Sequence, residues 1–60
     1  MFISFRDTKG DYITVNTDNI SAIRQYSQTV TEIIMTDNHI RFWADRPYIE
    51  LAGELKNAEN

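Results

Sequence analysis

The chain has 60 residues, with nine acidic and six basic side chains, one histidine and no cysteine, and its net charge is −3. This length accommodates one small domain, residues 1–60, and the lack of cysteine excludes disulfides and argues against a structural zinc site. The negative charge disfavours non-specific nucleic-acid binding, because such binding depends on neutralising phosphates with Lys and Arg.

Stability is marginal for a domain of this size, because the gain from apolar burial roughly offsets the conformational entropy lost on folding. Small domains of this kind gain support from disulfides, a metal or association with another chain. Self-association is the support that this composition leaves, so we expect a homo-oligomer, with a dimer favoured.

The first six residues, M-F-I-S-F-R, lack the basic region and the long apolar core of a signal peptide. No apolar run approaches the ~20 residues that a membrane-spanning helix needs. We therefore expect a cytoplasmic protein without membrane partners.

Two strands are predicted at the start of the chain. Phe2–Arg6 is the first, and the polar turn after it contains Gly10, which takes a positive φ at little cost. In the second, Tyr12–Asn16, Ile13 and Val15 point to the same side, which is typical of a half-buried strand. The two strands are expected to form a hairpin.

The next segment allows two interpretations. Residues 16–19 are polar and favour a turn, although the same residues suit the cap of a single helical turn beginning at Ile20. Ile20 and Ile23 have a helix-compatible spacing, but residues 20–26 also fit a strand with a bulge. We favour the strand, and the helical turn remains the alternative.

The clearest pattern in the sequence spans Thr29–Trp43, where two runs rich in β-branched and aromatic residues flank Asp37-Asn38. A two-residue loop at that pair predicts a β-hairpin. Slipping the register by one residue would place Asp37 opposite Ile40, so the apolar pattern fixes the register. The predicted facing pairs are Thr36 with His39, Met35 with Ile40, Ile34 with Arg41, and Ile33 with Phe42, which gathers Ile33, Met35, Ile40 and Phe42 on one face.

A helix is predicted after Trp43. Asp45 suits its N-cap and Pro47 its first turn. Gly53 weakens the helix by about 1 kcal/mol relative to Ala, so docking onto the sheet has to stabilise it. Its apolar face is expected to comprise Tyr48, Leu51, Ala52 and Leu55.

These elements predict an α+β fold, an antiparallel sheet of four to five short strands with one C-terminal helix packed on one face. One helix covers one face, yet several large apolar residues are assigned to the other. An exposed patch of that kind indicates a protein partner, whereas a sheet curled into a small barrel would bury it. The predicted partner-binding residues are Val30, Ile34, Arg41, Trp43 and Tyr12.

A nucleic-acid interface is the second hypothesis. Basic and aromatic residues that alternate on a sheet face can contact phosphates and stack on single-stranded bases. Such residues are Arg24, Tyr26, Arg41, Trp43 and Arg46. The net charge favours the protein partner over the nucleic acid.

No pattern predicts catalysis, a cofactor or a metal. His39 has neither a cysteine nor a second histidine to share a metal, and its closeness to Asp37 in sequence does not establish a catalytic pair. Asp7, Asp11 and Asp18 lie in or near turns, where carboxylates commonly bond the backbone. We therefore expect a protein that is not an enzyme.

The order of motifs resembles the FlbD-type family of small bacterial proteins associated with flagellar operons. The similarity rests first on Gly10, the pair Val15-Asn16 and the segment Asp18-Asn19-Ile20, followed by Ile23. Further along, Thr31, Ile33, Met35, Asn38 and Phe42 fit that family's Thr-x-Ile-x-Leu, Asn-Gly and aromatic progression. His39 stands where the family usually has Gly, Arg46-Pro47 replace a Glu-Ser pair, and the segment from Tyr26 to Val30 differs. The resemblance implies a cytoplasmic bacterial protein with a non-enzymatic, regulatory or motility-linked role.

Overall fold

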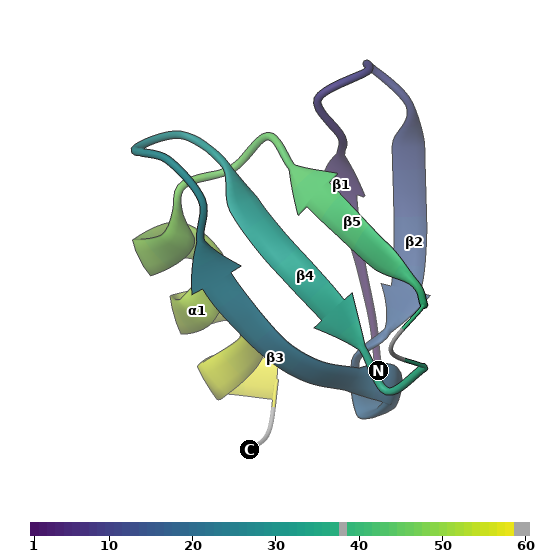
Figure 1. Cartoon of the computed structure of the whole chain (residues 1–60). Helices are drawn as coiled ribbons and strands as arrows, with labels where there is room; N and C mark the ends of the chain where they lie inside the picture. The colour runs from purple at the N-terminus through teal and green to yellow at the C-terminus, as the bar shows by residue number, and fades with distance from the viewer. Residues whose placement is uncertain (38, 59–60) are drawn as a thin grey trace.

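The computed structural model describes residues 1–37 and 39–58. In that part of the chain, five strands precede one α-helix, which confirms the α+β class (Figure 1). The elements are β1 (Phe2–Arg6), β2 (Tyr12–Asn16), a short 3-10 helix η1 (Thr17–Asn19), β3 (Ile20–Gln25), β4 (Thr31–Met35), β5 (Arg41–Ala44) and α1 (Tyr48–Ala58). None of the described helices is long and apolar enough to cross a membrane.

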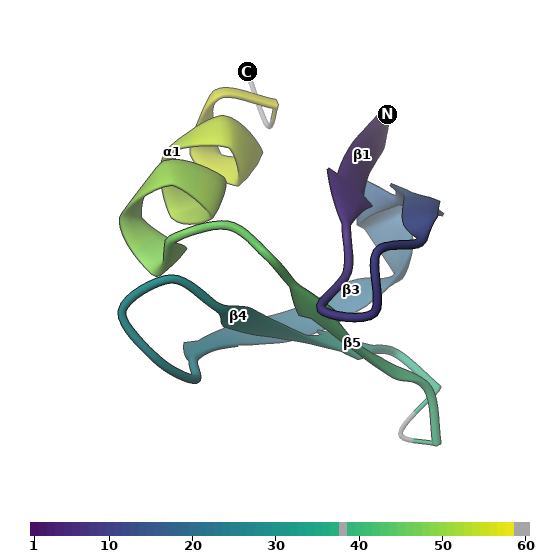
Figure 2. The same ribbon diagram turned by 90° about the horizontal axis from the view of Figure 1, so that it is seen from above.

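The strands form two antiparallel sheets, one of β1 and β2 and one in the order β3-β4-β5. A single bridge between Asp7 and Ala44 joins them, and the Thr8 N–H donates to the Trp43 carbonyl at 3.1 Å nearby. Figure 2 shows α1 and the β1–β2 hairpin side by side over the same face of the three-stranded sheet. We call that covered side the inner face.

The core lies between the inner face and the two elements that cover it. It comprises Ile3, Phe5, Val15, Ile33, Met35, Ala44 and Leu51. Phe5 and Phe42 meet edge to face at 6.0 Å between ring centres, which links the hairpin to β5. The chain therefore wraps one core from one side of the sheet, rather than closing a barrel that buries both sets of apolar residues.

The predicted register of the β4–β5 hairpin is confirmed. Ile33 pairs with Phe42 and Ile34 with Arg41. The Met35 N–H donates to the Ile40 carbonyl at 3.1 Å where the strands end. The predicted two-residue loop includes Asn38, which lies outside the described residues.

Ile40 is less buried than the predicted face requires. It keeps the side of Met35 and Phe42, whose side chains line the same pocket. However, it lies before the first residue of β5 and is 44% exposed, at the rim of that pocket.

The interpretation of residues 20–26 as a strand with a bulge is confirmed over Ile20–Gln25, and the irregularity falls between Ile20 and Ala22. The single helical turn that the sequence allowed from Ile20 is found before that residue, as the 3-10 helix at Thr17–Asn19. There the Asn16 side chain accepts a bond from the Asp18 N–H at 3.0 Å. Asn16 therefore caps a short 3-10 turn that leads directly into the strand.

The first hairpin is closed by Asp7 and Gly10. One carboxylate oxygen of Asp7 accepts bonds from the N–H groups of Lys9 and Asp11, at 3.0 and 2.9 Å. Gly10 has a φ of +92°, in the region that favours glycine. Asp7 thus acts as a turn-forming residue.

The start of α1 corrects one prediction. Asp45 is not the N-cap, because the helix begins at Tyr48 and the Asp45 N–H instead donates to the Arg6 carbonyl at 2.7 Å. Thr31, fully buried on β4, donates its hydroxyl to the Arg46 carbonyl at 2.8 Å. This bond ties the segment before the helix to the inner face, and Leu51 then buries the helix against the core.

Candidate functional site

The other side of the three-stranded sheet, which we call the outer face, carries two rows of facing side chains. In the first row, Glu32 on β4 lies between Arg24 on β3 and Trp43 on β5. In the second, Ile34 lies between Ala22 and Arg41. The outer face therefore comprises Ala22, Arg24, Glu32, Ile34, Arg41 and Trp43. Figure 2 shows α1 and the β1–β2 hairpin on the opposite side of the sheet.

Glu32 is the centre of an ion-paired group on this face. Its two carboxylate oxygens bind different arginines, Arg24 at 2.7 Å and Arg41 at 3.1 Å. The Glu32 side chain is 3% exposed, whereas Arg24 and Arg41 keep 66% and 45% of theirs in contact with solvent. The hydrogen bond from Arg41, followed by that from Arg24, holds the pKa of Glu32 below its usual value.

An aromatic and an aliphatic side chain complete the outer face. Trp43 stands directly opposite Glu32 and remains 39% exposed. Ile34 is half-buried beside Arg41. The surface thus combines the Trp43 indole and the Ile34 side chain with two cations that share one carboxylate.

Most of the predicted partner-binding residues are brought together. Ile34, Arg41 and Trp43 share the outer face, and Val30 is half-buried immediately before β4. Tyr12 is separated from them, because it belongs to the other sheet, where the Arg6 guanidinium lies 5.7 Å from its ring centre. The prediction that Tyr12 joins the patch is therefore wrong.

The predicted nucleic-acid set is divided. Arg46 does not lie with the others, since it pairs with Glu50 and Glu54 on α1. The bond to Glu54, and then that to Glu50, raises the pKa of Arg46.

Arg24, Arg41 and Trp43 do share the outer face, and Tyr26 follows β3 with its side chain exposed. Both of these arginines are bonded to Glu32, so the face offers phosphates less positive charge than the sequence suggests.

Glu32 is the residue of this face that sequence reasoning missed. The signal was present in the register, because pairing Ile33 with Phe42 also places Glu32 opposite Trp43 and on the same side as Arg41. A lone acidic residue among apolar strand neighbours is a candidate for pairing, since charged groups are seldom buried without a partner.

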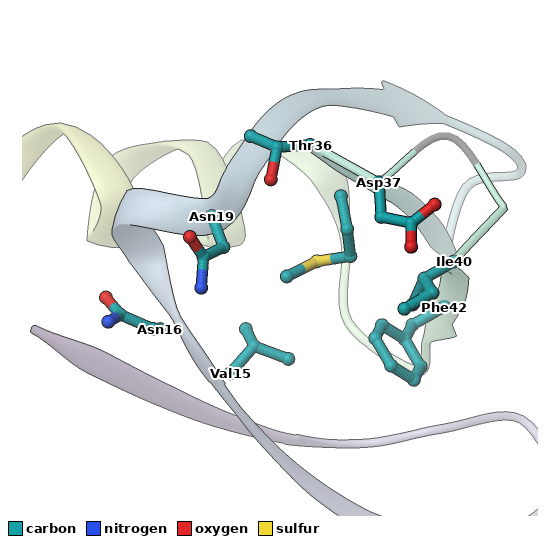
Figure 3. A pocket seen from close by; sticks show the side chains of 8 residues that line it. Val15, Asn16, Asn19, Thr36, Asp37, Ile40 and Phe42 are labelled. Atoms are coloured by element: carbon teal, nitrogen blue, oxygen red, sulfur yellow. The ribbon is translucent and has the colours of Figure 1, made fainter.

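A hollow of about 390 Å³ opens at the end of the β4–β5 hairpin that holds Thr36 and Asp37 (Figure 3). Met35 and Phe42 contribute apolar side chains to it, and Asn19 and Thr36 contribute polar ones. Its described lining is Val15, Asn16, Asn19, Met35, Thr36, Asp37, Ile40 and Phe42. Asp37 is the one carboxylate in that lining, and one of its oxygens already accepts the His39 N–H at 3.0 Å. The hollow therefore presents no pair of acid and base groups among these residues.

Comparison of the chain with models of known protein families, with curated proteins and with solved structures gives no match. The outer face, which no element in the described part of the chain covers, gathers aromatic and arginine side chains, and these residue types recur in protein interfaces.

Proposed function

We propose that this protein is a non-enzymatic interaction module that binds protein through its outer face, with a second copy of the chain as the favoured partner. One observation carries the proposal. A sheet face that no described element covers holds a partly exposed Trp43 beside an ion-paired, almost fully shielded Glu32.

The chemistry of the face suits burial against protein. Trp and Arg are the residues most enriched among those that dominate binding energy in interfaces. Glu32 already holds its two cations, so covering the face leaves no new unpaired carboxylate, which is the costly outcome when charge is buried.

The size of the chain supports self-association in particular. Its inner face buries one small core, and the sequence has no cysteine for a disulfide. Domains of this length commonly gain their remaining stability from association. A contact over the outer face would add apolar burial at Ile34 and Trp43.

Sedimentation velocity over a wide concentration range tests this proposal. We expect the parent chain to associate, and expect Trp43→Ala and Ile34→Glu to shift it to monomer while the circular dichroism spectrum stays folded. Tyr12→Ala is the matched control, because it removes an exposed aromatic side chain from the other sheet. Equal association of the parent and all three variants would reject the outer face as the contact.

The resemblance to FlbD-type proteins supports a narrower proposal for the cellular role. It implies a cytoplasmic bacterial regulator linked to motility, acting by binding rather than by catalysis. The order of genes around the coding sequence tests this role. Flagellar genes beside it would agree with the proposal, and a setting unrelated to motility would count against it.

A further inference from the structure

On the side away from β4, β3 carries backbone groups for which the described residues provide no hydrogen-bond partner. The Tyr26 N–H donates to the Val30 carbonyl at 3.0 Å, so the Tyr26 N–H points towards β4. Bonded and non-bonded pairs alternate along antiparallel strands. The backbone N–H and C=O groups of Arg24 therefore point towards Glu32 on β4. Those of Ile23 and Gln25 point away from β4.

Apolar side chains lie beside this edge, on the inner side of the sheet. Gln25, Gln28, Pro47, Tyr48 and Ile49 line a hollow of about 270 Å³ there. Ile49 is 84% exposed although it is a large aliphatic residue of α1. Figure 1 shows that α1 projects beyond β3, so a strand added to this edge would lie next to the start of the helix.

The outer side of the same edge is cationic. Arg24 is the one charged residue of β3, and its side chain remains 66% exposed while it pairs with Glu32. A strand added to β3 would therefore meet an apolar environment on one side and a guanidinium on the other.

We propose that the β3 edge binds an extended segment of a partner protein in which an acidic residue stands between two apolar ones. Antiparallel addition would place the acidic side chain opposite Arg24, on the outer side. The two apolar side chains would lie opposite Ile23 and Gln25, on the side of Tyr48 and Ile49. Backbone bonds supply affinity in this mode of recognition, and the alternating side chains supply specificity.

A second copy of β3 is a poorer occupant than such a segment. The bulge between Ile20 and Ala22 limits the regular edge to residues 22–26. Pairing two copies so that Ile23 of each bonds with Gln25 of the other would set Arg24 directly opposite its own copy. Like charges directly opposite one another destabilise a sheet.

This site shares Arg24 with the outer face. Its backbone bonds and its apolar contacts lie instead at the sheet edge and at the start of α1, so it can be tested separately from the proposed outer-face contact. The probe is the capped pentapeptide Glu-Ile-Glu-Ile-Glu, with Lys-Ile-Lys-Ile-Lys as its charge-reversed counterpart. Binding is measured by calorimetry, and the affected amides are located by nitrogen-15 NMR. We expect the acidic peptide to bind at least tenfold more tightly than the basic one and to shift the amides of Ile23 and Gln25 most.

Gln25→Pro is the decisive variant, because proline removes an N–H that points away from the sheet, a position where edge strands tolerate it. Thr14→Pro is the matched control. The Asp7 N–H bonds to the Asp11 carbonyl, and the resulting alternation turns the Thr14 N–H outward on the free edge of β2.

We expect Gln25→Pro to weaken the acidic peptide at least tenfold and Thr14→Pro to leave it unchanged, with both variants checked for folding by circular dichroism. Ile49→Ser, on the surface of α1, should weaken it several-fold and provides a readout if Gln25→Pro does not fold. Equal affinity for both peptides, or equal affinity in all variants, would overturn the proposal. Self-association of the parent that Gln25→Pro abolishes would show that the edge takes a second copy, which also overturns it.

Discussion

The side chains on the two faces of β4 are shielded from solvent in different ways. Thr31, Ile33 and Met35 point to the inner face, where α1 and the β1–β2 hairpin bury all three. Glu32 and Ile34 point to the outer face, which no described element covers. Glu32 is nevertheless as shielded as the core residues, because two arginine side chains extend across it.

The difference indicates which face of the sheet is covered by other elements of the same chain. The inner face has a second layer of structure and a continuous apolar core. On the outer face the cover over Glu32 consists of side chains that are themselves largely exposed, and Trp43 stays accessible. We infer that the inner face holds the fold together and that the outer face is the side available to a partner.

The largest effect on stability is expected at Ile33, which points to the inner face, whereas its neighbour Ile34 points to the outer face. Ile33→Ala empties a fully buried site and should lower the free energy of unfolding by about 2–5 kcal/mol, enough to unfold much of so small a domain. Ile34→Ala should cost about 1 kcal/mol, because that side chain is only half-buried. Urea unfolding of both variants at low protein concentration measures the contrast. Equal losses would mean that the two faces do not differ in the monomer.

A smaller effect is expected where the inner face is tied to the segment before α1. Thr31→Val keeps the volume of the side chain but leaves the Arg46 carbonyl without the hydroxyl that donates to it at 2.8 Å. The cost should be about 1 kcal/mol, which is typical of one lost hydrogen bond. Thermal unfolding followed by circular dichroism provides the measurement, and an unchanged midpoint would show that this bond does not hold the segment in solution.

Strengthening the cover of the inner face should stabilise the chain. Gly53 lies in α1 with no heavy atom within 4 Å of the position of an added Cβ, so alanine fits without a clash. Gly53→Ala should raise the free energy of unfolding by about 0.5–1 kcal/mol, through helix propensity. The same substitution at Gly10, where φ is +92°, should destabilise the protein and serves as the control. A loss of stability in Gly53→Ala would contradict the placement of the helix.

The smallest effect is expected in the pH dependence of stability that comes from Glu32 on the outer face. The pKa of Glu32 is lowered from 4.5, so the stability its pairing supplies is complete above that pH and is lost as the pH falls through the folded-state value. Glu32→Gln lacks this titration. The difference in unfolding free energy between parent and variant should therefore be largest near neutral pH and shrink as the pH falls below 4.5. A constant difference from neutral to acid pH would mean that the carboxylate is not paired.

Much of the fold follows from local rules. The register of Ile33 with Phe42 could be predicted because a slip by one residue would expose the apolar set, and the strand over Ile20–Gln25 could be predicted together with its bulge. The division into two sheets could not, because it depends on how far β1 pairs with β5, which lies far away in the sequence. The bridge between Asp7 and Ala44 joins the two sheets there.

The site was predicted less completely than the fold. That Ile34, Arg41 and Trp43 share a face could be predicted, because successive side chains of a strand alternate between the two faces of the sheet. Tyr12 was misassigned because the strands divide into two sheets and it lies in the other one. Arg46 was misassigned because it pairs with Glu50 and Glu54 on α1 instead of joining the sheet. The β4–β5 register already placed Glu32 on the side of Arg41, but its burial also requires Arg24 from β3, and the pairing of β3 with β4 was not predicted.

Fluorescence of Trp43 tests the outer face most directly, because it is the single tryptophan of the chain and lies on that face. Its emission should shift to shorter wavelength as the protein concentration rises, in step with the increase in mass measured by light scattering, and Ile34→Glu should abolish both changes. A parent chain that associates while the Trp43 emission stays constant would contradict the outer face as the contact. A parent chain that remains a monomer at every concentration would remove a second copy as its partner.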